Sequence, residues 1–125
     1  MTGLFALQKA IYGRLNGALP CAVYDDVPAD AELPYAVIGD GTVAPWGSKD
    51  LRGAECVATL NFYSGYGGMK EVDQLMEAAE RLLSAELEVE GWQVVVFGLE
   101  LANPVVDEDG TRHGVLRVRV KMVEA

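Results

Sequence analysis

The only histidine of the chain, His113, lies close in sequence to three acidic residues, Asp107, Glu108 and Asp109. A histidine oriented by a carboxylate can act as a general base when a nucleophile lies within hydrogen-bond reach. The sequence has no Gly-x-Ser-x-Gly element or other nucleophile signature. The acidic residues also precede Gly110 in a pattern typical of an exposed hairpin turn. We therefore expect His113 to be a surface residue, and the sequence predicts no catalytic residue and no enzyme.

Two other patterns could hold ions, but each is incomplete. Residues 65–68, Gly-Tyr-Gly-Gly, precede a predicted helix whose N-terminus could bind an anion, yet they lack the Gly-Lys-Ser/Thr ending of a phosphate loop. Asp25 and Asp26 could bind a divalent cation but lack calcium-loop spacing. Cys21, Cys56 and one histidine form no zinc pattern. We expect solvated turns, two reduced apolar cysteines, no metal site and no cofactor.

A third group of residues is better suited to contact than to catalysis. Trp46 lies in a segment rich in proline and glycine, residues 44–53, which the sequence predicts to be a long loop. Such an aromatic residue can anchor an interface, and nearby Lys49 and Arg52 favour a contact surface. Trp46 could equally fold back over the edge of the core. The sequence leaves both alternatives open.

The last predicted strand carries the strongest charge asymmetry. Leu116, Val118, Val120 and Met122 alternate along it with Arg117, Arg119 and Lys121. Side chains alternate across a strand, so one face is apolar and the other is a cationic row. This row could face another subunit or DNA, or it could pair with acidic residues on the neighbouring strand, among which Glu100 is a candidate.

The elements that position these residues are two amphipathic helices and several strands. Helical spacing predicts helices over residues 2–15 and 69–87, with Thr2 available to cap the first. Alternation predicts strands over residues 22–24, 35–43, 55–63, 92–106 and 113–123, with Pro104 marking a bend or an edge. The order predicts an α+β fold, a mainly antiparallel sheet with both helices packed on one face, in a single domain spanning residues 1–125.

Composition narrows the classes of partner. The chain has 125 residues and a formal net charge of -9, from 10 basic and 19 acidic residues. An acidic balance argues against general affinity for nucleic acid, although it leaves room for a local basic patch. No apolar run is long enough for a membrane span, and the N-terminus lacks the pattern of a signal peptide. We expect a protein that stays in the cytoplasm of the cell that makes it, without a membrane partner.

Several short motifs, in order along nearly the whole chain, resemble one known family. They are residues 7–15 (LQKAIYGRL), 23–28 (VYDDVP), 33–39 (LPYAVIG), Trp46, Lys49, 52–55 (RGAE), the Tyr63-Ser64 strand end with its glycine-rich turn, and 109–117 (DGTRHGVLR). Together they are similar to the tail terminator, or tail-completion, family of long-tailed (siphovirus-like) bacteriophages and phage-derived gene transfer agents.

The resemblance implies a structural virion protein made in the cytoplasm of a host bacterium. It implies a homo-oligomeric ring, typically a hexamer, at the head-proximal end of the tail. The ring ends polymerisation of the tail tube and joins the tail to the head connector, while DNA passes through its lumen without sequence-specific binding. Candidate interface residues are Trp46, Lys49, Arg52, Arg117, Arg119 and Lys121. A head-closure or neck protein of the same particle remains an alternative, as does a small nucleic-acid-binding regulator.

Overall fold

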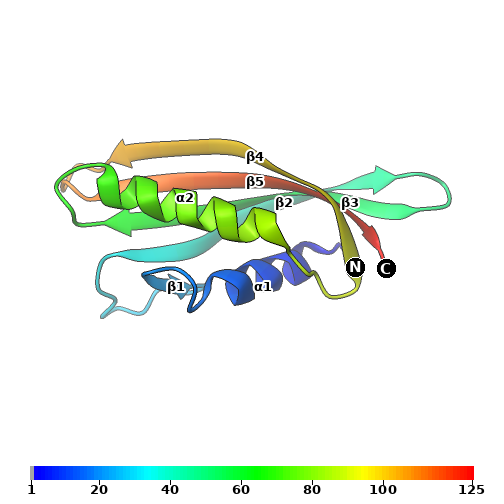
Figure 1. Ribbon diagram of the computed structural model, residues 1–125, viewed down its shortest axis with the longest axis horizontal. Helices are drawn as coiled ribbons and strands as arrows, with labels where there is room; N and C mark the ends of the chain where they lie inside the picture. The colour runs from blue at the N-terminus through cyan, green and yellow to red at the C-terminus, as the bar shows by residue number, and fades with distance from the viewer. Residues whose placement is uncertain (1) are drawn as a thin grey trace.

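The computed structural model describes residues 2–125, which form two helices and one five-stranded sheet (Figure 1). In chain order the elements are α1 (Leu4–Leu15), β1 (Ala22–Tyr24), β2 (Tyr35–Gly47), β3 (Arg52–Ser64), α2 (Lys70–Ala85), β4 (Trp92–Val106) and β5 (Arg112–Glu124). The strand order across the sheet is β1-β2-β3-β5-β4. β1 pairs with β2 in parallel, and the other three neighbouring pairs are antiparallel. The predicted α+β class is confirmed.

Both helices pack on the same face of the sheet and close one hydrophobic core. α1 contributes Leu7, Ile11 and Leu15 to this core, and α2 contributes an apolar stripe that includes Val72 and Leu83. α1 contacts β1 and β2, whereas α2 contacts β3, β4 and β5. Burial of each large apolar side chain stabilises the fold by roughly 1.5–3 kcal/mol. The sheet face opposite the helices carries no helix of the described chain, and we call it the open face.

The alternation predicted for the last strand is confirmed by the burial of β5. Leu116, Val118, Val120 and Met122 point into the core and are at most 1% exposed. Gly114 continues this buried series, and a Cβ atom there would lie 2.8 Å from Cγ2 of Val72 on α2. Glycine therefore lets α2 approach the backbone of β5 closely at this position.

The prediction of a long loop over residues 44–53 is wrong. β2 continues to Gly47 and β3 begins at Arg52, so the connection is a tight turn over residues 48–51. The amide of Ser48 donates to the carbonyl of Leu51 at 2.9 Å. Pairing with β3 outweighs the weak strand propensity of this segment, and its glycines are needed by the backbone, since Gly47 has φ +118°.

The predicted end of α1 at Leu15 is confirmed, whereas its start and both ends of α2 differ from the prediction by one or two residues, as helix ends often do. α1 begins at Leu4, where the amide of that residue donates to Oγ1 of Thr2 at 3.3 Å. The predicted turn before the last strand is present, because the amide of Gly110 donates to the carbonyl of Asp107 at 2.9 Å. No helix within residues 2–125 has the length and apolarity to cross a membrane.

Candidate interaction surfaces

The open face of the sheet collects most of the polar residues that the sequence singles out. The central strands β3 and β5 pair in register, so residues opposite one another share a face. Glu55 lies opposite Lys121, and Thr59 lies opposite Arg117. The predicted cationic row therefore stands on the face away from the helices.

Arg119 is the centre of a charge network on this face. Its guanidinium donates to Oε2 of Glu55 at 2.9 Å and to Oε1 of Glu100 at 2.7 Å. Nζ of Lys121 lies 3.9 Å from the same Glu55 oxygen. The hydrogen bonds from Glu55 and then Glu100 raise the pKa of Arg119 above its ordinary value, so its charge is permanent. Pairing of the row with Glu100 on the neighbouring strand, one of the two predicted alternatives, is confirmed for Arg119.

The network nearly balances the charge of the row. Three bases, Arg117, Arg119 and Lys121, face two acids, Glu55 and Glu100, which leaves one net positive charge. Arg117 is exposed and forms no ion pair with any residue in the described part of the chain. A surface with this balance offers few cations for neutralising phosphates.

Trp46 lies on the open face beside this network. Nζ of Lys121 is 5.7 Å from the centre of the indole ring, within the range of a cation–π contact. The ring also covers Gly53 on β3, where a Cβ atom would lie only 2.9 Å from Cε3 of the indole. Trp46 is thus half-buried against the sheet, folded onto the open face and not over the edge of the core.

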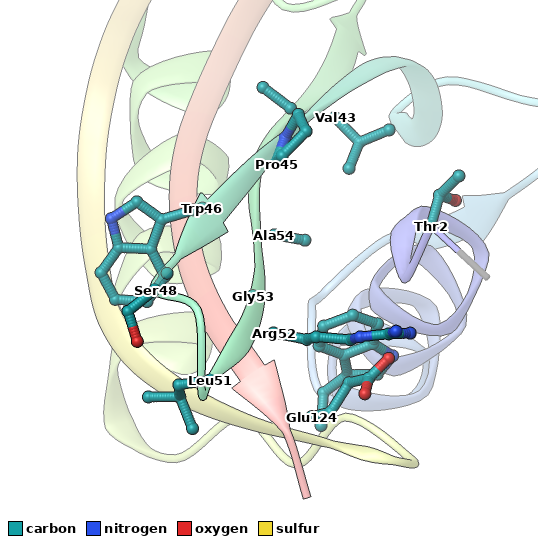
Figure 2. A pocket seen from close by; sticks show the side chains of 13 residues that line it. Thr2, Val43, Pro45, Trp46, Ser48, Leu51, Arg52, Gly53, Ala54 and Glu124 are labelled. Atoms are coloured by element: carbon teal, nitrogen blue, oxygen red, sulfur yellow. The ribbon is translucent and has the colours of Figure 1, made fainter.

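Lys49 lies in the turn of the β2–β3 hairpin, Arg52 is the first residue of β3 after that turn, and both are exposed. Figure 1 shows that this hairpin projects beyond the rest of the sheet. The three residues Trp46, Lys49 and Arg52 therefore belong to one projecting arm, although Trp46 and Arg52 point to opposite faces of it (Figure 2).

A pocket of about 600 Å³ lies along the same hairpin, between residues 43–48 and 51–54 and the chain around Thr2, Trp92 and Glu124. Figure 2 shows Thr2, Arg52 and Glu124 on one side of it, with Trp46 and Leu51 across β3. No histidine or cysteine is among the lining residues. The hydroxyls of Thr2 and Ser48 and the carboxylate of Glu124 line the pocket, and no hydrogen bond joins them within the described residues.

A row of aromatic rings crosses the open face at the opposite end of the sheet. Tyr24, Tyr35, Tyr63 and His113 come from four adjacent strands, and their successive ring centres are 5.7, 5.3 and 4.5 Å apart. Burial, followed by Tyr35 and Asp107, raises the pKa of Tyr63. Sequence reasoning missed this row, because the residues are far apart in the chain and only the strand register brings them together.

His113 is held by this row and by a polar neighbour. Its Nε2 donates to Oδ1 of Asn61 at 2.8 Å, and its Nδ1 lies 3.9 Å from a carboxylate oxygen of Asp107. The side chain is 20% exposed, so stacking covers more of it than the predicted surface position implied. The stacking on Tyr63 and the hydrogen bond to Asn61 show that His113 packs against its neighbours on the open face.

Residues that could bind metal remain dispersed. Within residues 2–125 no three histidine, cysteine or acidic side chains converge on a possible cation site. Cys21 and Cys56 do not pair with each other, and burial raises the pKa of both thiols, which keeps them protonated.

Comparisons with known proteins give one consistent result. A family model described as "Tail completion protein gp17" matches residues 8–122. The tail completion protein gp17 of Bacillus phage SPP1 is 31% identical over 120 residues, which cover 91% of this chain and 90% of that protein.

Solved structures agree with the sequence comparisons. A chain in the virion of a native gene transfer agent particle superimposes with a TM-score of 0.83 at 25% identity, covering 97% of this chain and 96% of the other. The structure of bacteriophage SPP1 gp17 superimposes with a TM-score of 0.64 at 28% identity, covering 93% and 88%. Each superposition therefore covers more than nine-tenths of this chain.

Proposed function

The chain belongs to the tail completion protein gp17 family, and from this membership we propose that it forms a ring that ends the tail tube. As a member of this family it is a structural protein of the virion tail of a phage or gene transfer agent, and it is not an enzyme. The proposal concerns how it acts there. A ring, hexameric in our proposal, sits at the head-proximal end of the tail, stops polymerisation of the tube and docks to the head connector.

The observation that carries the proposal is the match along almost the full length to a chain within an assembled gene transfer agent virion. A tail completion protein must contact the tube protein on one side and neck proteins on the other. The projecting arm with Trp46, Lys49 and Arg52 has the shape for one such contact, with the tail tube or a neighbouring subunit (Figure 1).

The charge balance of the open face supports the passage of DNA through the ring. A lumen that grips phosphates would impede movement of the genome, since each neutralised phosphate adds to binding. Arg119 and Lys121 are already engaged by Glu55 and Glu100, and the chain as a whole is acidic. In our proposal, the cationic row with Arg117 lines either the lumen or a subunit contact without tight or sequence-specific DNA binding.

Electron microscopy of particles made without this protein tests the proposal. Overlong tails without attached heads are expected, because nothing then stops the tube, and adding the protein in trans should restore tails of uniform length. Tails of normal length beside heads that have lost their DNA would instead assign the chain to head closure in the neck. Normal particles would refute both roles.

A further inference from the structure

We propose that adjacent copies of this chain join edge to edge, with the apolar edge strand β4 seated in the groove between α1, β1 and β2 of the next copy. This inference rests on the proposed ring and names the surfaces that would build it. The two surfaces lie on opposite edges of one molecule, as Figure 1 shows for β4 on one side and β1 with α1 on the other.

β4 is the first of these surfaces. It is the last strand of the sheet, and no other strand within residues 2–125 pairs with its outer edge. Its 15 residues span roughly 50 Å at about 3.3 Å per residue. Pairing with β5 places Val96, Leu101 and Val105 on the open face and Leu99 and Val106 on the helix face, so exposed apolar side chains flank this edge on both faces. Six large apolar side chains along β4 are between 36% and 53% exposed: Val95, Val96, Leu99, Leu101, Val105 and Val106.

The composition of β4 is unusual for an edge that faces water. Soluble proteins protect long edge strands with charged residues, above all lysine. Glu100 is the single charged residue of β4, and it is already bound to Arg119 at 2.7 Å. An exposed row of valine and leucine without charges is typical of a protein contact surface.

The groove on the opposite edge is the second surface. It has a volume of about 570 Å³, and its floor and walls include Phe5, Tyr12, Val23 and Ile38. Phe5 is 77% exposed, the highest value among the exposed large apolar side chains of the described chain, and Tyr12 is 36% exposed. Neither residue belongs to the buried core.

The polar residues of the groove lie where an interface rim needs them. Lys9, Asp25 and Asp26 line it together with the apolar side chains. A contact with an apolar centre and a charged rim is the ordinary anatomy of a protein interface. A partner that enters this groove should therefore be apolar and nearly uncharged, which describes the edge strand β4 with its apolar side chains on both faces.

The occupant is a second copy of this chain because the two surfaces complement one another on a single molecule. Contacts between two different surfaces of identical subunits are heterologous, and they close into a ring when the rotation allows. In such a ring every copy uses both edges, so no apolar edge remains exposed. The cationic row on β5 then lies outside the subunit contact, since β5 is separated from its edge by β4.

The test uses the purified full chain with Val96→Asp on β4 and Phe5→Asp on α1. Tyr66→Asp is the matched control, because Tyr66 is 53% exposed and lies neither on β4 nor in the groove. Assembly is measured by sedimentation velocity over a range of concentrations, and by electron microscopy of tail tubes that lack this protein. Each edge variant should associate at least about tenfold more weakly than the wild type, because it places an unpaired carboxylate in the contact. The control should assemble as the wild type does.

Mixing the two edge variants gives the sharper result. Each retains one intact surface, so a one-to-one mixture should form dimers that cannot extend, since both of their free ends are defective. A mixture that stays monomeric would overturn the pairing of these two surfaces. Edge variants that form normal rings, or a control that fails as they do, would overturn this inference and leave the ring itself intact.

The wild-type protein distinguishes failure of the proposed ring from failure of the edge contact alone. If it forms no ring in solution or on tube ends, the proposed ring fails, and the edge contact fails with it. Circular dichroism and thermal unfolding establish that each variant is folded. Val106→Asp, at a position 53% exposed near the end of β4, replaces Val96→Asp if that variant is unstable.

Discussion

Removing the two acids of the open-face network should convert a balanced surface into a DNA-binding one. In Glu55→Gln with Glu100→Gln, the side chains keep their size and can still hydrogen-bond to Arg119, but the carboxylate charges are lost. The summed charge of residues 55, 100, 117, 119 and 121 then rises from +1 to +3, because Arg117, Arg119 and Lys121 remain, while Asp40 beside them is unchanged. The variant therefore tests whether Glu55 and Glu100 keep this surface from holding phosphates.

The magnitude follows from counterion release. The slope of log K against log salt is about −0.9 for each phosphate neutralised, so three free bases predict a slope near −2.7 and one predicts about −0.9. Between 50 and 200 mM salt, affinity for duplex DNA should then fall roughly 40-fold for the variant and roughly 3-fold for the wild type. The assay is fluorescence anisotropy with a labelled duplex over that range of salt.

A matched variant separates the local effect from the change in total charge. Asp73→Asn with Glu77→Gln removes two exposed acids from α2, on the other side of the sheet. Total charge rises equally in both double variants, so only the open-face variant should bind DNA more tightly. Equal slopes for the two double variants would refute the argument that Glu55 and Glu100 neutralise this particular surface.

Three further predictions concern packing. Gly114→Val should lower the free energy of unfolding by roughly 1–3 kcal/mol in thermal or urea melts, because its Cβ atom would lie 2.8 Å from Val72; an unchanged melting temperature would contradict the close contact with α2. Cys56 should resist alkylation in the folded protein at pH 8 and react on unfolding, since burial raises the pKa of its thiol; fast labelling of the native state would show that the site opens. Trp46→Ala should leave the core stable, within about 1 kcal/mol, yet weaken incorporation onto tail tubes, whereas normal incorporation measured by electron microscopy would remove Trp46 from the contact.

The sequence predicts the central strands well because their burial pattern is local and periodic. On β5 the apolar residues from Leu116 to Met122 alternate without interruption, and each lies in the core. The segment around Trp46 fails for the opposite reason. Its prolines and glycines favour a loop locally, and only pairing with residues of β3 over a short turn makes it a strand. Pairing across this turn leaves no periodic signal within the segment itself.

The contacts of the cationic row could likewise be predicted only in part. A partner for the cationic row on the neighbouring strand could be predicted, and Glu100 is that partner for Arg119. The contribution of Glu55 could not, because it comes from β3, whose pairing with β5 joins residues 64 positions apart. The aromatic row from Tyr24 to His113 has the same origin, since four strands must be in register before the rings meet.

In the proposed contact, the outer edge of β4 must bind one partner without binding other exposed strands. Register shifts between Val94 and Val96 and between Leu99 and Leu101 interrupt its pairing with β5, and such bulges twist an edge away from regular ladders. Pro104 removes one more backbone donor from the strand. These features oppose indiscriminate strand addition but leave the side chains of valine and leucine exposed. In the edge contact that we propose, recognition then depends on a shaped apolar groove and not on a continuous backbone ladder, so each copy binds only the complementary edge of another.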